Sequence, residues 1–122
     1  MKTTYLLIGW AIIALGVLHI SATPRFFHAL TSSALWFASG GLALVLTGTL
    51  NLLNRTYGQE ARGLRKACVA ANIVMAVFSL VSGLVGHASA AMLVVVVGLM
   101  SGASALSLTR AAVAARSSSG AA

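Results

Sequence analysis

The fold of this chain is decided by residues 67–109, which read ACVAANIVMAVFSLVSGLVGHASAAMLVVVVGLMSGASALSLT. The stretch carries no charged residue, and as one helix it would be about 65 Å long. That length is roughly twice the hydrocarbon thickness of a bilayer, so the stretch must fold back on itself. Gly86 and His87 interrupt the apolar run. We therefore predict two membrane-spanning helices here, at 67–86 and 90–110.

Two shorter uncharged stretches precede this one, at 3–24 and 26–54. A membrane span needs roughly 20 apolar residues, so each stretch fits one helix. We predict these helices at 4–22 and 30–53.

The predicted fold is an all-α integral membrane protein, a compact bundle of four transmembrane helices. Residues 1–116 form its single domain, and the serine-rich residues 117–122 form a disordered tail. Thr23 and Pro24 form a helix-start signal, with Thr23 as the N-cap and Pro24 at the first helical position. The second helix is thus expected to begin with an interfacial turn before it enters the membrane.

The composition supports this assignment and excludes several classes of function. Of 122 residues, eight are Lys or Arg, one is acidic and 59% are hydrophobic, whereas a soluble domain of this size would carry about 30 charged residues. The chain has no aspartate, and Glu60 is its one acidic residue, which excludes paired-carboxylate chemistry. One cysteine, Cys68, excludes an intramolecular disulfide, and we interpret it as a small buried residue rather than a nucleophile.

The basic residues flank the apolar segments, an arrangement that sets membrane orientation and does not indicate nucleic-acid binding. Four predicted spans place Arg25 on one side and every other basic residue on the opposite side. These are Lys2, Arg55, Arg62, Arg65, Lys66, Arg110 and Arg116. Both termini are therefore predicted to be cytoplasmic, and the Ala- and Gly-rich composition suggests a bacterial inner membrane.

Each predicted helix carries small residues at helical spacing, which favours close helix packing in lipid. The glycines expected at helix contacts are Gly9, Gly16, Gly41, Gly48, Gly83, Gly98 and Gly102. Because all four predicted helices carry such a face, we expect a four-helix bundle that also associates with further copies of itself or with a larger membrane complex.

Asn51 and Asn72 are predicted to lie at similar depth in the cytoplasmic half, near the level of Ser101 and Ser104. Two interpretations fit these residues. The first is an interhelical hydrogen-bond clasp, and the second is a polar substrate site. We favour the clasp, because buried amides in membrane helices usually bond to a neighbouring helix.

The predicted topology gathers three histidines on the outer side, namely His19, His28 and His87, and Arg25 lies near them. Imidazoles bind zinc, copper or haem iron, and they titrate near neutral pH. However, no HxxxH pair fixes two ligands on one helix, and no carboxylate is available to orient the rings. The alternatives are three locally bonded interfacial histidines, a metal or haem site, and a pH-sensitive or substrate-binding cluster; no cofactor is predicted.

In length and number of spans the chain resembles the small multidrug transporters. That family depends on a glutamate in its first helix, and 4–22 contains none, so its activity is not carried over. The sequence favours a non-enzymatic helix-packing module or subunit of a membrane assembly. The alternative is a binding or transport protein for a small ligand, a metal or haem at the outward histidines, where Arg25 would suit an anion.

Overall fold

The structure is a computed structural model that describes residues 1–109, and the regular elements of that part are all helices. They are α1 (Lys2–Phe26), α2 (Ser32–Tyr57), α3 (Arg62–Val85) and α4 (Ala90–Leu108). Each is long and apolar enough to cross a membrane, which confirms the prediction of an all-helical chain with four spans. The chain is therefore a multi-pass membrane protein in contact with lipid. Arg110, Arg116 and the predicted tail lie outside the described residues.

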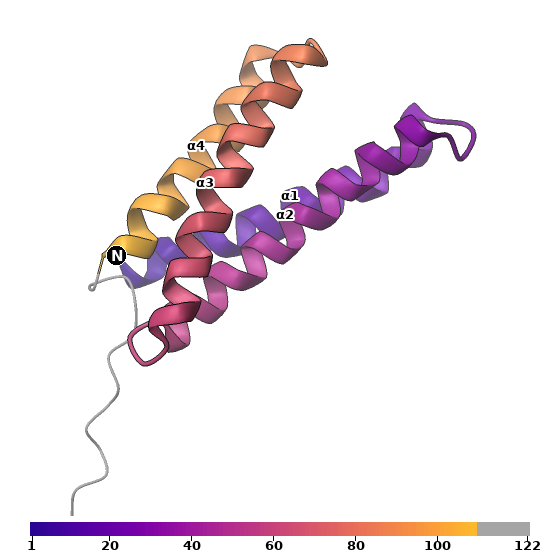
Figure 1. Ribbon diagram of the computed structural model, residues 1–122. Coiled ribbons are helices and arrows are strands. Elements are labelled where there is room, and N and C mark those ends of the chain that lie inside the picture. The colour runs from indigo at the N-terminus through magenta and orange to yellow at the C-terminus, as the bar shows by residue number, and fades with distance from the viewer. Residues whose placement is uncertain (110–122) are drawn as a thin grey trace, which may run out of the picture.

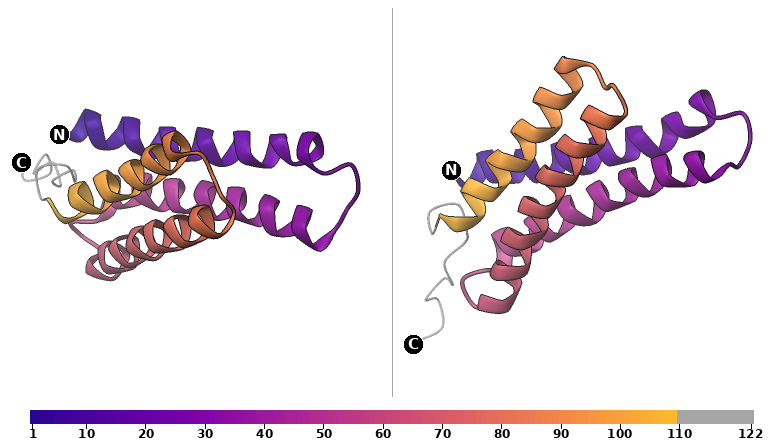
Figure 2. Two further views of the ribbon diagram at one scale, coloured as in Figure 1. Left: turned by 90° about the horizontal axis from the view of Figure 1, so that it is seen from above. Right: turned by 45° about the horizontal axis from the view of Figure 1, so that its top comes forward.

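The four helices form two antiparallel hairpins, α1–α2 and α3–α4 (Figure 1). The hairpins meet at the end that holds the N-terminus, the α2–α3 connection and the end of α4, and they diverge toward the other end (Figure 2). The buried residues of α3 and α4 all belong to the joined half: Cys68, Asn72, Met100, Ala103 and Ser107. The compact packing predicted for the whole bundle is thus found in one half only.

Glycines bring the backbones of α1 and α2 together. A side-chain carbon added at Gly16 would lie 2.6 Å from the Gly41 carbonyl oxygen, and one added at Gly48 would lie 2.9 Å from the Gly9 carbonyl oxygen. Because each helix repeats its glycine after seven residues and the helices are antiparallel, the two pairs come into register. Such close approach is a main source of helix association in lipid.

The glycines of the second hairpin are less uniform. Gly83 of α3 leaves room for the side chain of Leu93 on α4, whereas Gly102 meets only the tip of Ile8 from α1, at 3.4 Å. Gly98 is exposed, and apart from its chain neighbours and the backbone of its own helix no atom of the described chain lies within 4 Å of a side-chain carbon placed there. The GxxxG pair of α4 therefore leaves one glycine facing outward.

The connection between α1 and α2 corrects the predicted helix start. Pro24 lies in the last turn of α1, where the Phe27 amide donates to the Thr23 carbonyl at 2.9 Å. Helix α2 begins at its own N-cap, Thr31, whose hydroxyl accepts a hydrogen bond from the Ala34 amide at 3.2 Å. A span in lipid gains from satisfying its backbone within the helix, and this outweighed the preference of proline for a first turn.

Candidate functional site

Five polar side chains meet in the joined half of the molecule. They come from three helices: Tyr5 from α1, Asn51 and Asn54 from α2, and Cys68 and Asn72 from α3. Each is at most 1% exposed. We refer to these five residues as the polar cluster.

Asn51 is the centre of the polar cluster. Its Oδ1 accepts hydrogen bonds from the Tyr5 hydroxyl at 2.9 Å and from Asn72 Nδ2 at 2.9 Å. The Cys68 thiol donates to the same oxygen at 3.4 Å. Asn51 Nδ2 in turn donates to Asn72 Oδ1 at 2.7 Å and to the Thr47 carbonyl at 2.8 Å. One amide thus ties α2 to both α1 and α3.

Tyr5 and Asn54 extend the cluster, and the sequence interpretation missed both. Asn54 Nδ2 donates to the Tyr5 hydroxyl at 2.9 Å, whereas Asn54 Oδ1 is buried without a hydrogen-bond partner among residues 1–109. This oxygen lies against Gly58, where a side-chain carbon would collide with it. The available signal was position: Tyr5 follows Lys2 by three residues and Asn54 precedes Arg55 directly, which places both at the depth of the other amides.

The two serines predicted at this level do not join the polar cluster. Ser104 donates to the carbonyl of Met100 on its own helix at 2.8 Å, and Ser101 is exposed. Ser107 is the buried serine of α4, and its hydroxyl donates to the Ser104 carbonyl at 2.7 Å. Helix α4 therefore satisfies the hydroxyls of Ser104 and Ser107 itself.

A cleft of about 640 Å³ lies between the hairpins in the half where they diverge. All four helices line it, mostly with apolar side chains such as Leu44, Met75, Phe78 and Leu93. Its lining includes one imidazole, that of His19, which α1 contributes. This cleft is the candidate ligand site of the described chain.

The His19 ring is held in place on the wall of the cleft. It stacks on the ring of Phe37 from α2, with centroids 3.8 Å apart and planes inclined by 18°. Gly40 faces the same ring, and a side-chain carbon there would lie 3.7 Å from His19 Nε2. The absence of a side chain at Gly40 leaves the imidazole open to the cleft.

The three histidines are not brought together. His28 lies in the α1–α2 connection and His87 in the α3–α4 connection, and Figure 1 shows these connections at the tips of different hairpins. Within residues 1–109, no three His, Cys, Asp or Glu side chains are placed to hold a metal ion. Arg25 lies in the last turn of α1, where a cation stabilises the helix dipole.

The backbone gives His87 a structural role. Its φ is 52°, in the left-handed region, and the following amide, of Ala88, donates to the Gly83 carbonyl at 2.9 Å. This pattern closes a helix in the Schellman manner, at a position usually held by glycine. His87 therefore ends α3 and directs the chain into α4.

The polar cluster and the cleft offer hydrogen-bonding groups and apolar contacts. The polar cluster consists of amides, a hydroxyl and a thiol that bond to one another, and the residues lining the cleft include no carboxylate. The chain matches no protein family model, no curated protein and no solved structure. A proposal for its function therefore rests on the geometry of the cleft and of the polar cluster.

Proposed function

We propose that this chain is a non-enzymatic protein of the bacterial inner membrane that binds a small amphipathic molecule in the cleft between its hairpins. The cleft itself is the observation that carries the proposal. Its volume is about 640 Å³, its walls are mostly apolar, and its polar lining includes the stacked imidazole of His19 together with Trp36, Ser79 and Ser82. Sites for small molecules are typically concave and apolar, with a few placed polar groups.

The proposed binding mode follows from the lining. An apolar body would pack between the two hairpins, against side chains such as Leu44 and Phe78, and one polar group would bond to the His19 imidazole. The stack on Phe37 fixes the ring, so little rotamer freedom is lost on binding. Haem, which the His19 imidazole would hold, belongs to the same class of occupant, and an absorption spectrum of the purified protein would distinguish it.

The proposed orientation places the N-terminus and the α2–α3 connection in the cytoplasm, as the basic residues favour. The described basic residues other than Arg25 lie at the chain start, at the end of α2 and in the first turns of α3. The cleft would then open toward the outer face. Phosphatase fusions at Gly58 and at His28 test this, because only the fusion at His28 should be active.

The binding proposal is tested with two neighbouring positions of α2. Gly40→Leu adds bulk to the cleft beside His19, whereas Ser39→Leu adds a similar side chain at an exposed position that does not line it. The proteins are purified from native membranes in mild detergent, and bound small molecules are extracted and identified by mass spectrometry.

The expected result is one compound shared by the unmodified protein and Ser39→Leu, and its loss from Gly40→Leu and His19→Ala. Identical extracts from all four proteins, or an unmodified protein that carries no small molecule, would contradict the proposal.

A second candidate function is that of a subunit in a homo-oligomer or larger membrane assembly. The observation that favours it is the exposed Gly98, which has open space around it and lies beside exposed Ser101 and Ala105. Gly98→Leu would block close approach of another helix. If assembly uses this face, the particle mass in mild detergent falls for Gly98→Leu and stays unchanged for Ser39→Leu.

A further inference from the structure

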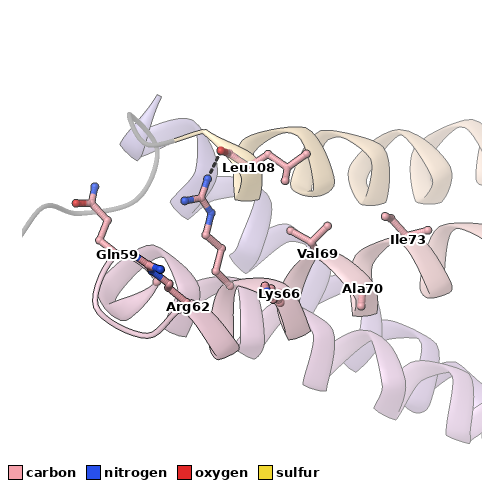
Figure 3. Close-up of a pocket in the computed structure, with 9 residues that line it drawn as sticks. Gln59, Arg62, Lys66, Val69, Ala70, Ile73 and Leu108 are labelled. Atoms are coloured by element: carbon pink, nitrogen blue, oxygen red, sulfur yellow. Dashed lines mark hydrogen bonds between the residues drawn. The ribbon is translucent and has the colours of Figure 1, made fainter.

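A second hollow lies at the opposite end of the molecule, beside the start of α3. It is a groove of about 700 Å³, bordered by the α2–α3 connection, the first half of α3 and the end of α4 at Leu108 (Figure 3). It shares no lining residue with the cleft between the hairpins. It is thus a separate feature that the proposed function does not use.

The part of the groove beside the α2–α3 connection is positively charged. Arg62, Arg65 and Lys66 line it, and the chain has one acidic residue, Glu60, in the adjoining connection. Arg65 is engaged, because its guanidinium donates to the Leu108 carbonyl at the end of α4 (Figure 3). Arg62 and Lys66 are exposed and have no hydrogen-bond or ion-pair partner in residues 1–109.

The part of the groove farther along α3 is apolar. Val69, Ala70 and Ile73 continue the lining one to two turns beyond Lys66, to its right in Figure 3. Positions 62, 66, 70 and 73 fall on one face of a helix. From 62 to 73 the helix rises about 16 Å, which is close to the depth of one leaflet of hydrocarbon.

We infer that this groove binds an anionic phospholipid, with its phosphate between Arg62 and Lys66 and an acyl chain along Val69, Ala70 and Ile73. Along the groove the cations come first and the apolar side chains follow. An anionic phospholipid has the same order of groups, with its phosphate followed by its acyl chains. Basic pockets between membrane helices attract anionic headgroups in this way. Arg65 positions the groove by joining the start of α3 to the end of α4, which leaves the other two cations for the headgroup.

The test measures lipid binding to the full chain by native mass spectrometry in mild detergent. Phosphatidylglycerol and phosphatidylcholine with identical acyl chains are offered at equal concentration, with inorganic phosphate as a competitor in a further arm. The groove variant is Arg62→Gln with Lys66→Gln. The matched control is Lys2→Gln with Arg55→Gln, which removes the same charge from the same end of the molecule but not from the groove.

The expected result is preferential binding of phosphatidylglycerol. The groove variant should bind it about 25-fold more weakly, at about fivefold for each cation. The control variant should stay within about threefold of the unmodified protein, and Ala70→Phe should weaken binding by filling the apolar part without a change of charge. Far-UV circular dichroism checks that each variant is folded.

Three outcomes would overturn the inference. Equal binding of the two lipids would show that the cations do not select the headgroup. An equal loss in the control variant would show general attraction to charge rather than a groove. Displacement of phosphatidylglycerol by inorganic phosphate at equal concentration would show a phosphate site without a contribution from the acyl chain.

Discussion

Two buried asparagines of α2 should differ in how much they stabilise the fold. Asn51 forms hydrogen bonds through both its amide oxygen and its amide nitrogen, whereas Asn54 forms one through its nitrogen only among the described residues. Asn51 makes three bonds of 2.7 to 2.9 Å to the side chains of Tyr5 and Asn72 on other helices. Interhelical bonds in membranes contribute about 0.6 to 1.7 kcal/mol each. Asn51→Leu keeps the volume of the side chain and removes all three, so the free energy of unfolding should fall by about 2 to 5 kcal/mol.

Asn54 is the matched control for this experiment. Within the described part of the chain its side chain makes one bond, to Tyr5, and buries an oxygen that has no partner there. Leaving a buried acceptor unpaired costs about 1 to 3 kcal/mol, so Asn54→Leu relieves a penalty while it loses one bond. We therefore expect the free energy of unfolding to fall by less than about 1 kcal/mol, or to rise.

Both variants are unfolded with sodium dodecyl sulfate from mild-detergent micelles, and helicity is followed by circular dichroism. Equal destabilisation by the two variants, or a loss below about 1 kcal/mol for Asn51→Leu, would refute the assignment of Asn51 as the centre of the cluster.

Three further predictions concern helix contacts and helix ends. Gly16→Ala should lower the free energy of unfolding by about 1 to 3 kcal/mol, because the new carbon would lie 2.6 Å from the carbonyl oxygen of Gly41. Gly63→Ala is the control: open space surrounds Gly63, so this variant should leave the free energy of unfolding unchanged in the same sodium dodecyl sulfate titration. Thr31→Ala should cost about 1 kcal/mol through loss of the α2 N-cap, and faster amide exchange confined to the first turn of α2 would identify that cause. Arg65→Gln removes a cation from the end of α4 and should cost about 0.3 to 1 kcal/mol, with faster exchange in its last turn; unchanged exchange there would contradict the contact.

The sequence predicted the four spans well because charge and hydropathy decide where a chain can cross lipid. The charged residues at both ends of each apolar stretch limit where its helix can begin and end in lipid. The turn at Gly86 and His87 lies where the apolar run is interrupted. The end of α1 was placed wrongly because Pro24 carries a local signal that the membrane overrides.

The candidate site was predictable only in part. Depth counted from the flanking charges placed Asn51 beside Asn72, and the structure joins their amides. The same count placed Ser101 at that level, but depth does not specify which way a side chain faces, and Ser101 faces outward. Likewise, placing His28 and His87 on one side of the membrane did not specify that the two hairpins diverge.

The divergence of the hairpins has a mechanical consequence. Helices α1, α2 and α3 have 25, 26 and 24 residues, so each is about 36 to 39 Å long, which exceeds the roughly 30 Å of hydrocarbon in a bilayer. A helix longer than the hydrocarbon layer accommodates the difference by tilting. Since the hairpins are joined at one end only, their tilt sets how wide the other end stands open. We expect longer lipid tails to raise the first hairpin and narrow the gap, which spin labels at exposed Leu35 and Val85 would register as a shorter separation.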